Sequence, residues 1–333
     1  MAPSRLRRYV LSRIAAAILI VAVVMVINFL LTHVVPGNPV DALVGEYPAP
    51  PDYVEKLKRD FGLDRSLGVQ LWLYATELAR GNLGFSFANR EAVLPLILRH
   101  AGKTLLLMIP ALSAAAIGGI LLGSAAARRA GGLYDAALTA VSLAGYATPV
   151  FWLSQVLIVI FAVTLHWLPA QGMLSIVPGS GNFSGLVGDY LRHLVLPGFA
   201  IAISYMAVVA RVSRVSLLEA MQQDFVLLAL SKGLRPARVF WRHVLPNALI
   251  PVITVIGYNF GFALTGAILT ETVFGWPGLG YLFITSIAKR DYPVLEGIFL
   301  LASLAVVLAN LLTDLAYALV DPRVRRTFFE AAA

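Results

Sequence analysis

The chain has 333 residues, of which 59% are hydrophobic and only 13% are charged, where a soluble domain would carry about 25%. It contains no cysteine, which excludes disulfides, zinc–thiolate sites, iron–sulfur clusters and cysteine nucleophiles. The formal net charge of +8 does not indicate nucleic-acid binding, because no basic stretch is interleaved with aromatic residues in a soluble module. With a mean hydropathy of +0.80, most of the chain is suited to face lipid or to pack inside a helical bundle.

Six segments have the length and apolar character of membrane spans, since about 20 mostly apolar residues are needed to cross the hydrocarbon core. They lie at about 9–31, 104–127, within 136–168, 194–210, 248–270 and 297–320. The first span follows a basic N-terminus, as a signal peptide would, but no small-residue cleavage site comes after it, so we expect a retained helix. The sequence therefore predicts an all-α membrane protein with six transmembrane helices.

The basic residues predict the orientation of these spans. More than half of the 26 Lys and Arg residues lie in the two terminal tails and in the two loops that share their side of the membrane. The two shorter loops on the opposite side contain only Arg192, Lys289 and Arg290. Because basic residues gather in cytoplasmic loops, both termini are predicted to be cytoplasmic.

This topology divides the chain into four parts. Residues 1–34 form an N-terminal tail and the first helix, and residues 35–99 form an external loop in which the amphipathic stretch 52–61 is a candidate short helix. A five-helix membrane core spans 100–320 and includes a long cytoplasmic loop at 211–247. Residues 321–333 form a cytoplasmic tail.

The predicted spans contain almost no ionisable side chain that could perform chemistry. Only Glu271 and Asp314 lie near span interiors or ends, whereas ion-coupled carriers often place ionisable residues at mid-membrane. The five histidines are far apart in sequence and form no metal-protease pair. No phosphate-binding loop or serine-nucleophile elbow is complete. The chain is therefore predicted to be a passive pathway that takes its energy from elsewhere, and not an enzyme.

The cytoplasmic loop carries the most specific pattern. Residues 224–234 read Asp-Phe-Val-Leu-Leu-Ala-Leu-Ser-Lys-Gly-Leu. We predict two short helices joined at Gly233, because Asp224 suits a first helical turn and glycine suits a C-terminal cap. Three arginines at helical spacing would lie on one face of the second helix: Arg235, Arg238 and Arg242. From these residues alone, an ordinary amphipathic connector whose arginines set the topology explains the pattern equally well.

The same segment resembles the ATPase-docking loop of ABC importer permeases, which is known for a Glu-Ala-Ala…Gly motif. Gly233 and the Leu-Pro pair at 245–246 have the spacing of that motif, and Ala229 matches one of its alanines, whereas Leu227 replaces its glutamate. The dipeptide/oligopeptide/nickel branch, with its Asp-Tyr-Val…Ala…Ala-Lys-Gly-Leu pattern, is more similar. Further agreement with that branch extends along nearly the whole chain, at 36–39, 61–64, 81–84, 148–152, 271–280 and 321–325.

The resemblance implies the fold and the partners of the chain. The fold would be that of a type I ABC importer permease, and the long external loop is typical of the first of the two permeases in such systems. The chain would form half of a pathway for dipeptides or oligopeptides across the cell inner membrane. Its partners would be a second permease in a heterodimer, two ATP-binding subunits, an external substrate-binding protein and the lipid bilayer.

The resemblance also implies that the chain binds no cofactor or metal itself, with ATP and Mg held by the ATPase partners. Nickel, glutathione or another small solute is an alternative substrate. An ion-coupled secondary transporter is the alternative to an ABC importer.

Two sets of residues are candidates for function. Carried over residue by residue, the resemblance assigns ATPase coupling to Asp224, Ala229, Lys232, Gly233, Leu234, Arg242, Leu245, Pro246 and Asn247. A polar side chain in a span usually faces the bundle interior, which suggests the translocation pathway for Thr148, Trp152, Tyr205, Tyr258, Asn259, Thr265 and Glu271. Helix–helix hydrogen bonding is the alternative for this second set, and a structural cap of the next loop is the alternative for Glu271.

Overall fold

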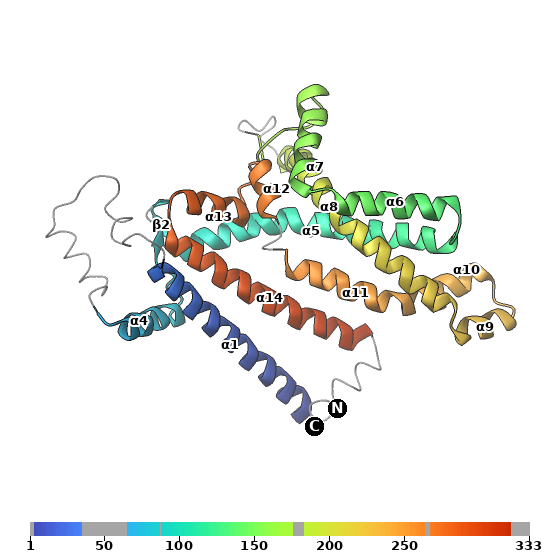
Figure 1. Cartoon of the computed structure of the whole chain (residues 1–333), viewed down its shortest axis with the longest axis horizontal. Helices are drawn as coiled ribbons and strands as arrows, with labels where there is room; N and C mark the ends of the chain where they lie inside the picture. The colour runs from blue at the N-terminus through green and yellow to red at the C-terminus, as the bar shows by residue number, and fades with distance from the viewer. Residues whose placement is uncertain (1–2, 35–64, 87, 176–182, 264–266, 321–333) are drawn as a thin grey trace.

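The computed structural model describes residues 3–34, 65–86, 88–175, 183–263 and 267–320, most of them in long helices that pack side by side (Figure 1). In chain order the first helices are α1 Pro3–Val34, α4 Leu67–Ala79, α5 Val93–Arg128, α6 Leu133–Ala147, α7 Val150–Leu157 and the π-helical η1 Ile158–Thr164. They are followed by α8 Phe183–Met221, α9 Asp224–Ser231, α10 Pro236–Val239, the π-helical η2 Phe240–Val244, α11 Leu245–Gly261, α12 Ile268–Val273, α13 Leu279–Ala288 and α14 Tyr292–Val320. A small antiparallel hairpin pairs β1 Phe85–Ser86 with β2 Glu91–Ala92.

The predicted helical membrane protein is confirmed. Four stretches of the described residues are long and apolar enough to cross a membrane: α5, α8, the stretch Pro236–Gly261 and the stretch Tyr292–Ala309. The pair α6 and α7–η1 provides a fifth crossing if the two are counted as one bent span. Helix α1 contributes a further apolar stretch at Ile14–Leu30. The candidate helix 52–61, Thr265 and the tail 321–333 lie outside the described residues.

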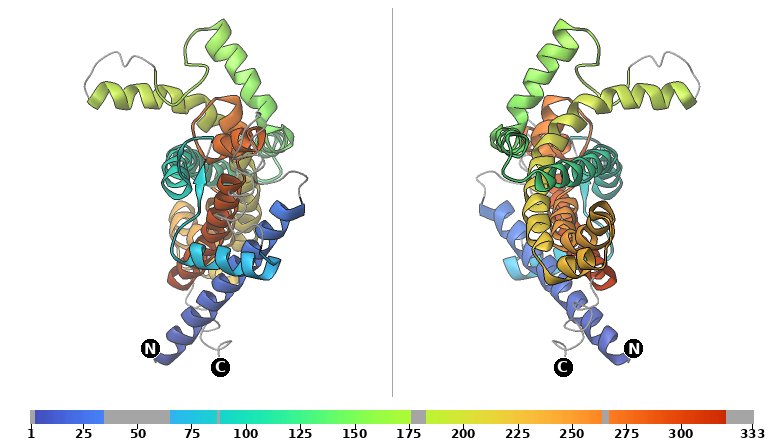
Figure 2. Two further views of the ribbon diagram at one scale, coloured as in Figure 1. Left: turned by 90° about the vertical axis from the view of Figure 1, so that its left-hand side faces the viewer. Right: turned by 90° about the vertical axis from the view of Figure 1, so that its right-hand side faces the viewer.

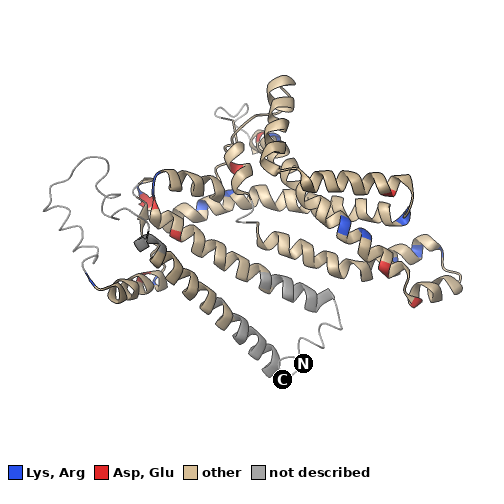
Figure 3. Cartoon of the chain, viewed as in Figure 1, with Lys and Arg blue, Asp and Glu red and all other residues tan. Residues whose placement is uncertain are grey.

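Charged side chains mark the ends of the long helices. Figure 3 shows Lys, Arg, Asp and Glu mainly near the two ends of the bundle and around α12 and the start of α8, with long uncharged stretches of α5, α8, α11 and α14 between them. Many large apolar side chains in these stretches are exposed, including Leu106, Ile117 and Leu121 of α5. Exposed apolar side chains of this kind are suited to contact lipid or another membrane subunit.

The third predicted span is broken near its middle. Helix α6 ends at Ala147, and α7–η1 leaves it at an angle of 98° after Thr148 and Pro149. Proline has no backbone N–H and disfavours helical geometry in the residue before it, and Thr148 accordingly has an extended backbone. As Figure 2 shows, η1 and the beginning of α8 project from one side of the bundle.

Helices α5 and α8 approach each other closely. A Cβ atom on Gly119 would lie 2.6 Å from Val209 Cβ, and one on Gly123 would lie 2.5 Å from the Ala210 carbonyl oxygen. These glycines are four residues apart, so they lie on one face of α5 and let the two backbones touch. Dispersion between close backbones and side chains drives such packing, because lipid tails are as apolar as leucine.

A hydrogen bond between the same two helices replaces one that a proline removes. Pro110, inside α5, has no N–H to donate to the Leu106 carbonyl one turn earlier. The hydroxyl of Tyr190 in α8 donates to that carbonyl at 2.7 Å. This backbone acceptor thus obtains a partner from the neighbouring helix, as a membrane environment without water requires.

Helices α1 and α14 pack as an antiparallel pair. The side-chain amide of Asn28, near the end of α1, donates to the Glu296 carbonyl near the start of α14 at 3.3 Å. The beginning of α1 and the end of α14 therefore lie on the same side of the bundle (Figure 1). That both termini are cytoplasmic stays a prediction.

Two turns at the opposite end contain arginine in left-handed backbone geometry. Arg290 (φ 53°) follows α13 in a Schellman motif, in which its N–H donates to the Ile287 carbonyl at 3.1 Å. Arg90 (φ 58°) lies in the turn before β2. Left-handed geometry costs a non-glycine residue roughly 1–2 kcal/mol. A cation at a helix C-terminus recovers about 0.3–1 kcal/mol, which applies to Arg290 but not to Arg90.

The α5–α8 contact predicts a large difference between two glycine substitutions in one helix. Gly123→Ala should lower the free energy of unfolding by about 2 kcal/mol, because the helices must separate to admit the methyl group. Gly102→Ala, where no atom lies within 4 Å of the added Cβ, should instead raise it by up to about 1 kcal/mol through helix propensity. Thermal unfolding in detergent measures both, and equal melting temperatures would contradict the close contact.

Candidate functional site

A cavity of about 590 Å³ lies at the corner between α6 and α7, against α8 and α11. Its lining residues are Tyr146, Thr148, Val150, Ser204, Tyr205, Val208, Thr254, Val255, Tyr258 and Asn259. Four of the predicted pathway residues are among them, namely Thr148, Tyr205, Tyr258 and Asn259. The break at Pro149 positions Thr148 at this corner, so the cavity depends on the bend of the third span.

Two helices present polar side chains to the cavity at helical spacing. On α8, Val208 lies about one turn after Ser204 and Tyr205. On α11, residues 258 and 259 lie one turn after 254 and 255. Sequence reasoning missed Tyr146, Ser204 and Thr254. Ser204 and Thr254 could have been found from their positions. Ser204 directly precedes the selected Tyr205, and Thr254 lies one helical turn before the selected Tyr258.

The cavity lining is mostly apolar and uncharged, with a few hydroxyl and amide groups among its residues. The hydroxyls of Thr148, Ser204 and Thr254 donate to carbonyls one turn earlier in their own chain, at 2.7, 3.5 and 3.3 Å. Their oxygens keep lone pairs that can accept hydrogen bonds. The phenol of Tyr258 and the amide of Asn259 add groups that both donate and accept. Such a lining can exchange hydrogen bonds with peptide-like amides without holding a fixed charge.

The other predicted pathway residues lie elsewhere. Trp152, on α7, is half-exposed and does not line the cavity. Glu271 is fully buried away from it, and Thr265 lies outside the described residues. Among the residues that the structure describes, no three His, Cys, Asp or Glu side chains are grouped so that they could hold a metal ion.

Glu271 connects three helices in a buried hydrogen-bond network. The Thr104 hydroxyl of α5 donates to Glu271 Oε1 at 2.7 Å. The backbone N–H groups of Gly280 and Tyr281, at the start of α13, donate to Glu271 Oε2 at 2.7 and 3.2 Å. The Thr104 oxygen in turn accepts the Leu279 N–H at 2.8 Å. This geometry is that of a cap on α13, in which a carboxylate satisfies otherwise unpaired donors at a helix N-terminus.

A buried tryptophan supports the same region. Trp276 has no exposed surface, and its Nε1–H donates to the Lys103 carbonyl of α5 at 2.9 Å. Its ring lies 6.0 Å from the ring of Tyr190, the residue that bonds the carbonyl left free by Pro110. Helices α12 and α13 are therefore fastened to α5 and α8 by directional bonds and by packing.

The segment 224–234, predicted to be cytoplasmic, has the predicted helix–glycine–helix form. Asp224 lies in the first turn of α9, and Gly233 follows the helix with φ 79°. Its N–H donates to the Leu230 carbonyl at 2.9 Å, and the N–H of Leu234 donates to the Ala229 carbonyl at 3.3 Å. These two bonds form a Schellman motif, which favours glycine because the position is left-handed.

Helix α9 has one buried face and one exposed apolar face. Val226 and Ala229 pack into a core with Leu217, Ala220, Val239, Phe240, Val244, Ala248 and Ala127. The opposite face presents Leu227 and Leu228, which are 64% and 57% exposed, at the tip of the molecule. Lys232, Arg242, Pro246 and Asn247 are also exposed, whereas Leu245 packs against the core. Exposed apolar side chains grouped on a helix of this kind indicate a binding surface.

An ion pair connects the third span to the helix that leads into α9. Arg214 of α8 donates from Nε to Asp135 Oδ1 at 2.5 Å and from Nη2 to Oδ2 at 2.7 Å. Asp135, in the first turn of α6, is only 4% exposed and also accepts the Gly131 N–H at 3.0 Å. This ion pair could not be predicted from the sequence, because its two residues are 79 positions apart.

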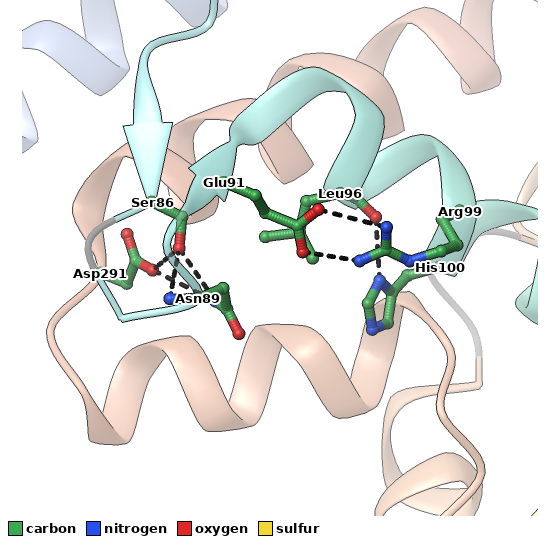
Figure 4. A network of polar contacts seen from close by, with 7 residues as sticks. All are labelled: Ser86, Asn89, Glu91, Leu96, Arg99, His100 and Asp291. Carbon is green, nitrogen blue, oxygen red and sulfur yellow. Dashed lines mark hydrogen bonds and ion pairs between the residues drawn. The ribbon is translucent and has the colours of Figure 1, made fainter.

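A second polar network ties the hairpin to the turn between α13 and α14 (Figure 4). The Ser86 hydroxyl donates to Asp291 Oδ2 at 2.5 Å, and the Asn89 amide donates to the same oxygen at 3.4 Å. Beside it, Arg99 donates two hydrogen bonds to Glu91, at 2.6 and 3.2 Å. These bonds lower the pKa of the Glu91 carboxyl below its usual value.

Comparison with known proteins identifies the family of the chain. Residues 119–326 match the family described as binding-protein-dependent transport system inner membrane component, and residues 6–108 match the N-terminal family of the same components. The chain belongs to this family. It is an ABC importer permease and a multi-pass inner-membrane protein, so the resemblance found in the sequence is confirmed.

Curated relatives match over nearly their full length. The di/tripeptide transport system permease protein DppB of Pseudomonas aeruginosa is 40% identical over 91% of this chain and 94% of its own. The dipeptide transport system permease protein DppB of Escherichia coli K12 is 34% identical over 96% and 98%. Among solved structures, an inward-facing MetNI methionine ABC transporter covers 68% of this permease and 96% of its own chain, with 16% identity and a TM-score of 0.54. This likeness confirms the ABC importer permease fold.

The Glu271 network predicts a stability effect that depends on the acceptor atoms. Glu271→Ala removes the acceptor for the Thr104 hydroxyl and for two N–H groups, and should lower the free energy of unfolding by about 3 kcal/mol. Glu271→Gln keeps one acceptor oxygen and should cost less. Thermal unfolding in detergent measures both variants.

Glu77→Ala provides the control, because Glu77 forms a surface ion pair with Arg80 that should contribute less than about 1 kcal/mol. A loss at Glu271 no larger than that at Glu77 would contradict the capping role.

Proposed function

We propose that this permease forms half of the translocation pathway of an ATP-driven importer for dipeptides or oligopeptides. A second, related permease would complete the pathway, an external substrate-binding protein would deliver the solute, and two ATPase subunits would dock beneath. The names of the relatives support peptides as the substrate class. The mostly apolar cavity, with a few hydroxyl and amide groups and no carboxylate or imidazole among its lining residues, favours peptides over a bare metal ion.

The observation that carries the docking proposal is the two-faced helix α9. Its buried face joins it to the ends of α5 and α8, and its exposed leucines remain available for an ATPase groove. ATP binding would bring the two ATPases together and displace α9. The core that α9 shares with α8 and η2 would pass this movement to the spans, so that the pathway alternates between outward-facing and inward-facing states.

The docking role predicts selective loss of the ATPase. In the double variant Asp224→Ala/Gly233→Trp, the ATPase should no longer co-purify, whereas the two permeases should stay together. The indole would lie beside α9, and tryptophan disfavours the left-handed backbone at this position. Size-exclusion chromatography with subunit quantification measures the stoichiometry.

Gly131→Trp is the matched control for this experiment. Gly131 lies in the turn between α5 and α6 with φ 78°, close to the 79° of Gly233, and no atom lies within 4 Å of a Cβ at either position. The control should therefore carry the same backbone cost and retain the ATPase. Loss of the ATPase from the control but not from the double variant would move the docking site to the α5–α6 turn.

The pathway role of the cavity predicts a block of transport without loss of assembly. Ser204→Phe fills part of the cavity and should reduce dipeptide uptake into proteoliposomes by about tenfold, the scale on which small changes in pocket shape discriminate between substrates. ATPase subunits should remain bound. Ser303→Phe is the control, because Ser303 of α14 also donates to its own helix, at 2.7 Å to the Phe299 carbonyl, but does not line the cavity. Normal uptake by Ser204→Phe would exclude this cavity from the pathway.

A further inference from the structure

The end of the bundle opposite α9 carries a basic surface that neither the cavity nor the cytoplasmic segment uses. Arg90 lies in the turn between β1 and β2, and Lys289 and Arg290 lie in the turn between α13 and α14. All three side chains are exposed. We refer to Arg90, Lys289 and Arg290 as the basic rim.

Hydrogen bonds hold the two turns of the basic rim together. Asp291 directly follows Arg290, and it accepts hydrogen bonds from Ser86 at 2.5 Å and from Asn89, the residue before Arg90, at 3.4 Å (Figure 4). Ser86 is fully buried and Asp291 is only 6% exposed. The network therefore fixes the backbone positions from which the rim side chains extend.

The carboxylates nearest to the rim already have partners. Glu91 accepts both hydrogen bonds from Arg99, and Asp291 accepts those of Ser86 and Asn89. Within the described ranges, the ion pairs join Arg80 to Glu77, Arg99 to Glu91, His193 to Asp189 and Arg214 to Asp135, and none includes a rim residue. The rim thus presents cationic side chains to solvent.

Two general preferences oppose arginine at these positions. Arg90 and Arg290 have left-handed backbones, which glycine would adopt without strain. The predicted topology also places the turn of Arg290 in a short external loop, where membrane proteins carry fewer basic residues. Neither helix capping nor topology accounts for Arg90, so the rim charge is best explained by an external ligand of opposite charge.

We propose that the basic rim docks an acidic face of the external substrate-binding protein, an inference that rests on the proposed function. The family description itself refers to transport that depends on a binding protein. The fixed backbone of both turns favours a protein partner over mobile lipid headgroups, because preorganisation lowers the cost of fixing one specific geometry. Charges at the edge of an interface mainly raise the association rate, and they do so in a salt-dependent manner.

The test uses the complete transporter in nanodiscs of neutral lipid, with its purified binding protein as the probe. ATP hydrolysis is measured against binding-protein concentration at low and high salt. In the double variant Arg90→Gly/Arg290→Gly, the half-saturating concentration at low salt should rise by about tenfold, with the maximal rate unchanged. The difference from wild type should shrink at high salt, where screening removes the attraction.

Further variants separate charge from backbone effects. Arg90→Gln/Arg290→Gln removes the charge but keeps the left-handed side chains, and should weaken docking as much as the glycine pair. Arg90→Lys/Arg290→Lys should retain docking. Because glycine relieves backbone strain, the glycine pair should melt no lower than wild type. Arg192→Gln, which changes an exposed basic residue outside the rim, should leave the half-saturating concentration unchanged.

Three outcomes would overturn the proposal. The first is an unchanged half-saturating concentration in both charge-removing pairs. The second is an equal effect of Arg192→Gln. The third is a rim effect that appears only when anionic lipid is added to the nanodisc, which would assign the rim to the membrane surface. If the binding protein does not stimulate the wild-type complex at all, the proposed function fails first and the docking proposal with it.

Discussion

The close contact between α5 and α8 is the constraint on which the rest of the bundle depends. Gly119 and Gly123 let the two helices approach until a single methyl group would clash with backbone and side-chain atoms. From this pair, α5 reaches the Glu271 network at one end, and α8 extends to Arg214 and the core around α9 at the other. The cavity residues Ser204 and Tyr205 lie on α8 close to this contact. Both candidate sites therefore share helix α8.

Much of the fold could be predicted from the sequence, because membrane spans and helix ends depend on local chemistry. Hydropathy located the apolar helices, and Asp224 and Gly233 located the ends of α9 through capping preferences that act within a few residues. The helix limits were less accurate. Helix α5 begins at Val93 and α8 continues to Met221, several residues beyond the predicted spans. Apolar spacing at Val93, Leu96 and Ile97 continues the helix into a protein core, where the edge of the bilayer does not end it.

The sites were predicted in part. Thr148, Tyr205, Tyr258 and Asn259 were selected because a polar side chain in a span usually faces the bundle interior, and all four line the cavity. Serine and threonine were harder to select, because they bond their own helix wherever they lie and give no sign of what they face. The sequence left two roles open for Glu271, and its geometry is that of the cap. That choice depends on Thr104, which is 167 positions away and could not be paired with Glu271 from one sequence.

The ion pair of Asp135 and Arg214 has a mechanical consequence. It attaches the first turn of α6 to α8 just before α9, and the other end of α6 leads to Tyr146 and Thr148 at the cavity. The 15 residues of α6 make a rod about 22 Å long. If α6 tilted by about 5° about the Asp135–Arg214 ion pair, Thr148 at its far end would move by about 2 Å, given that length. Because the helix is interrupted at Pro149, α7 need not move with α6. Such a tilt of α6 would therefore widen or narrow the cavity at the corner between the two helices.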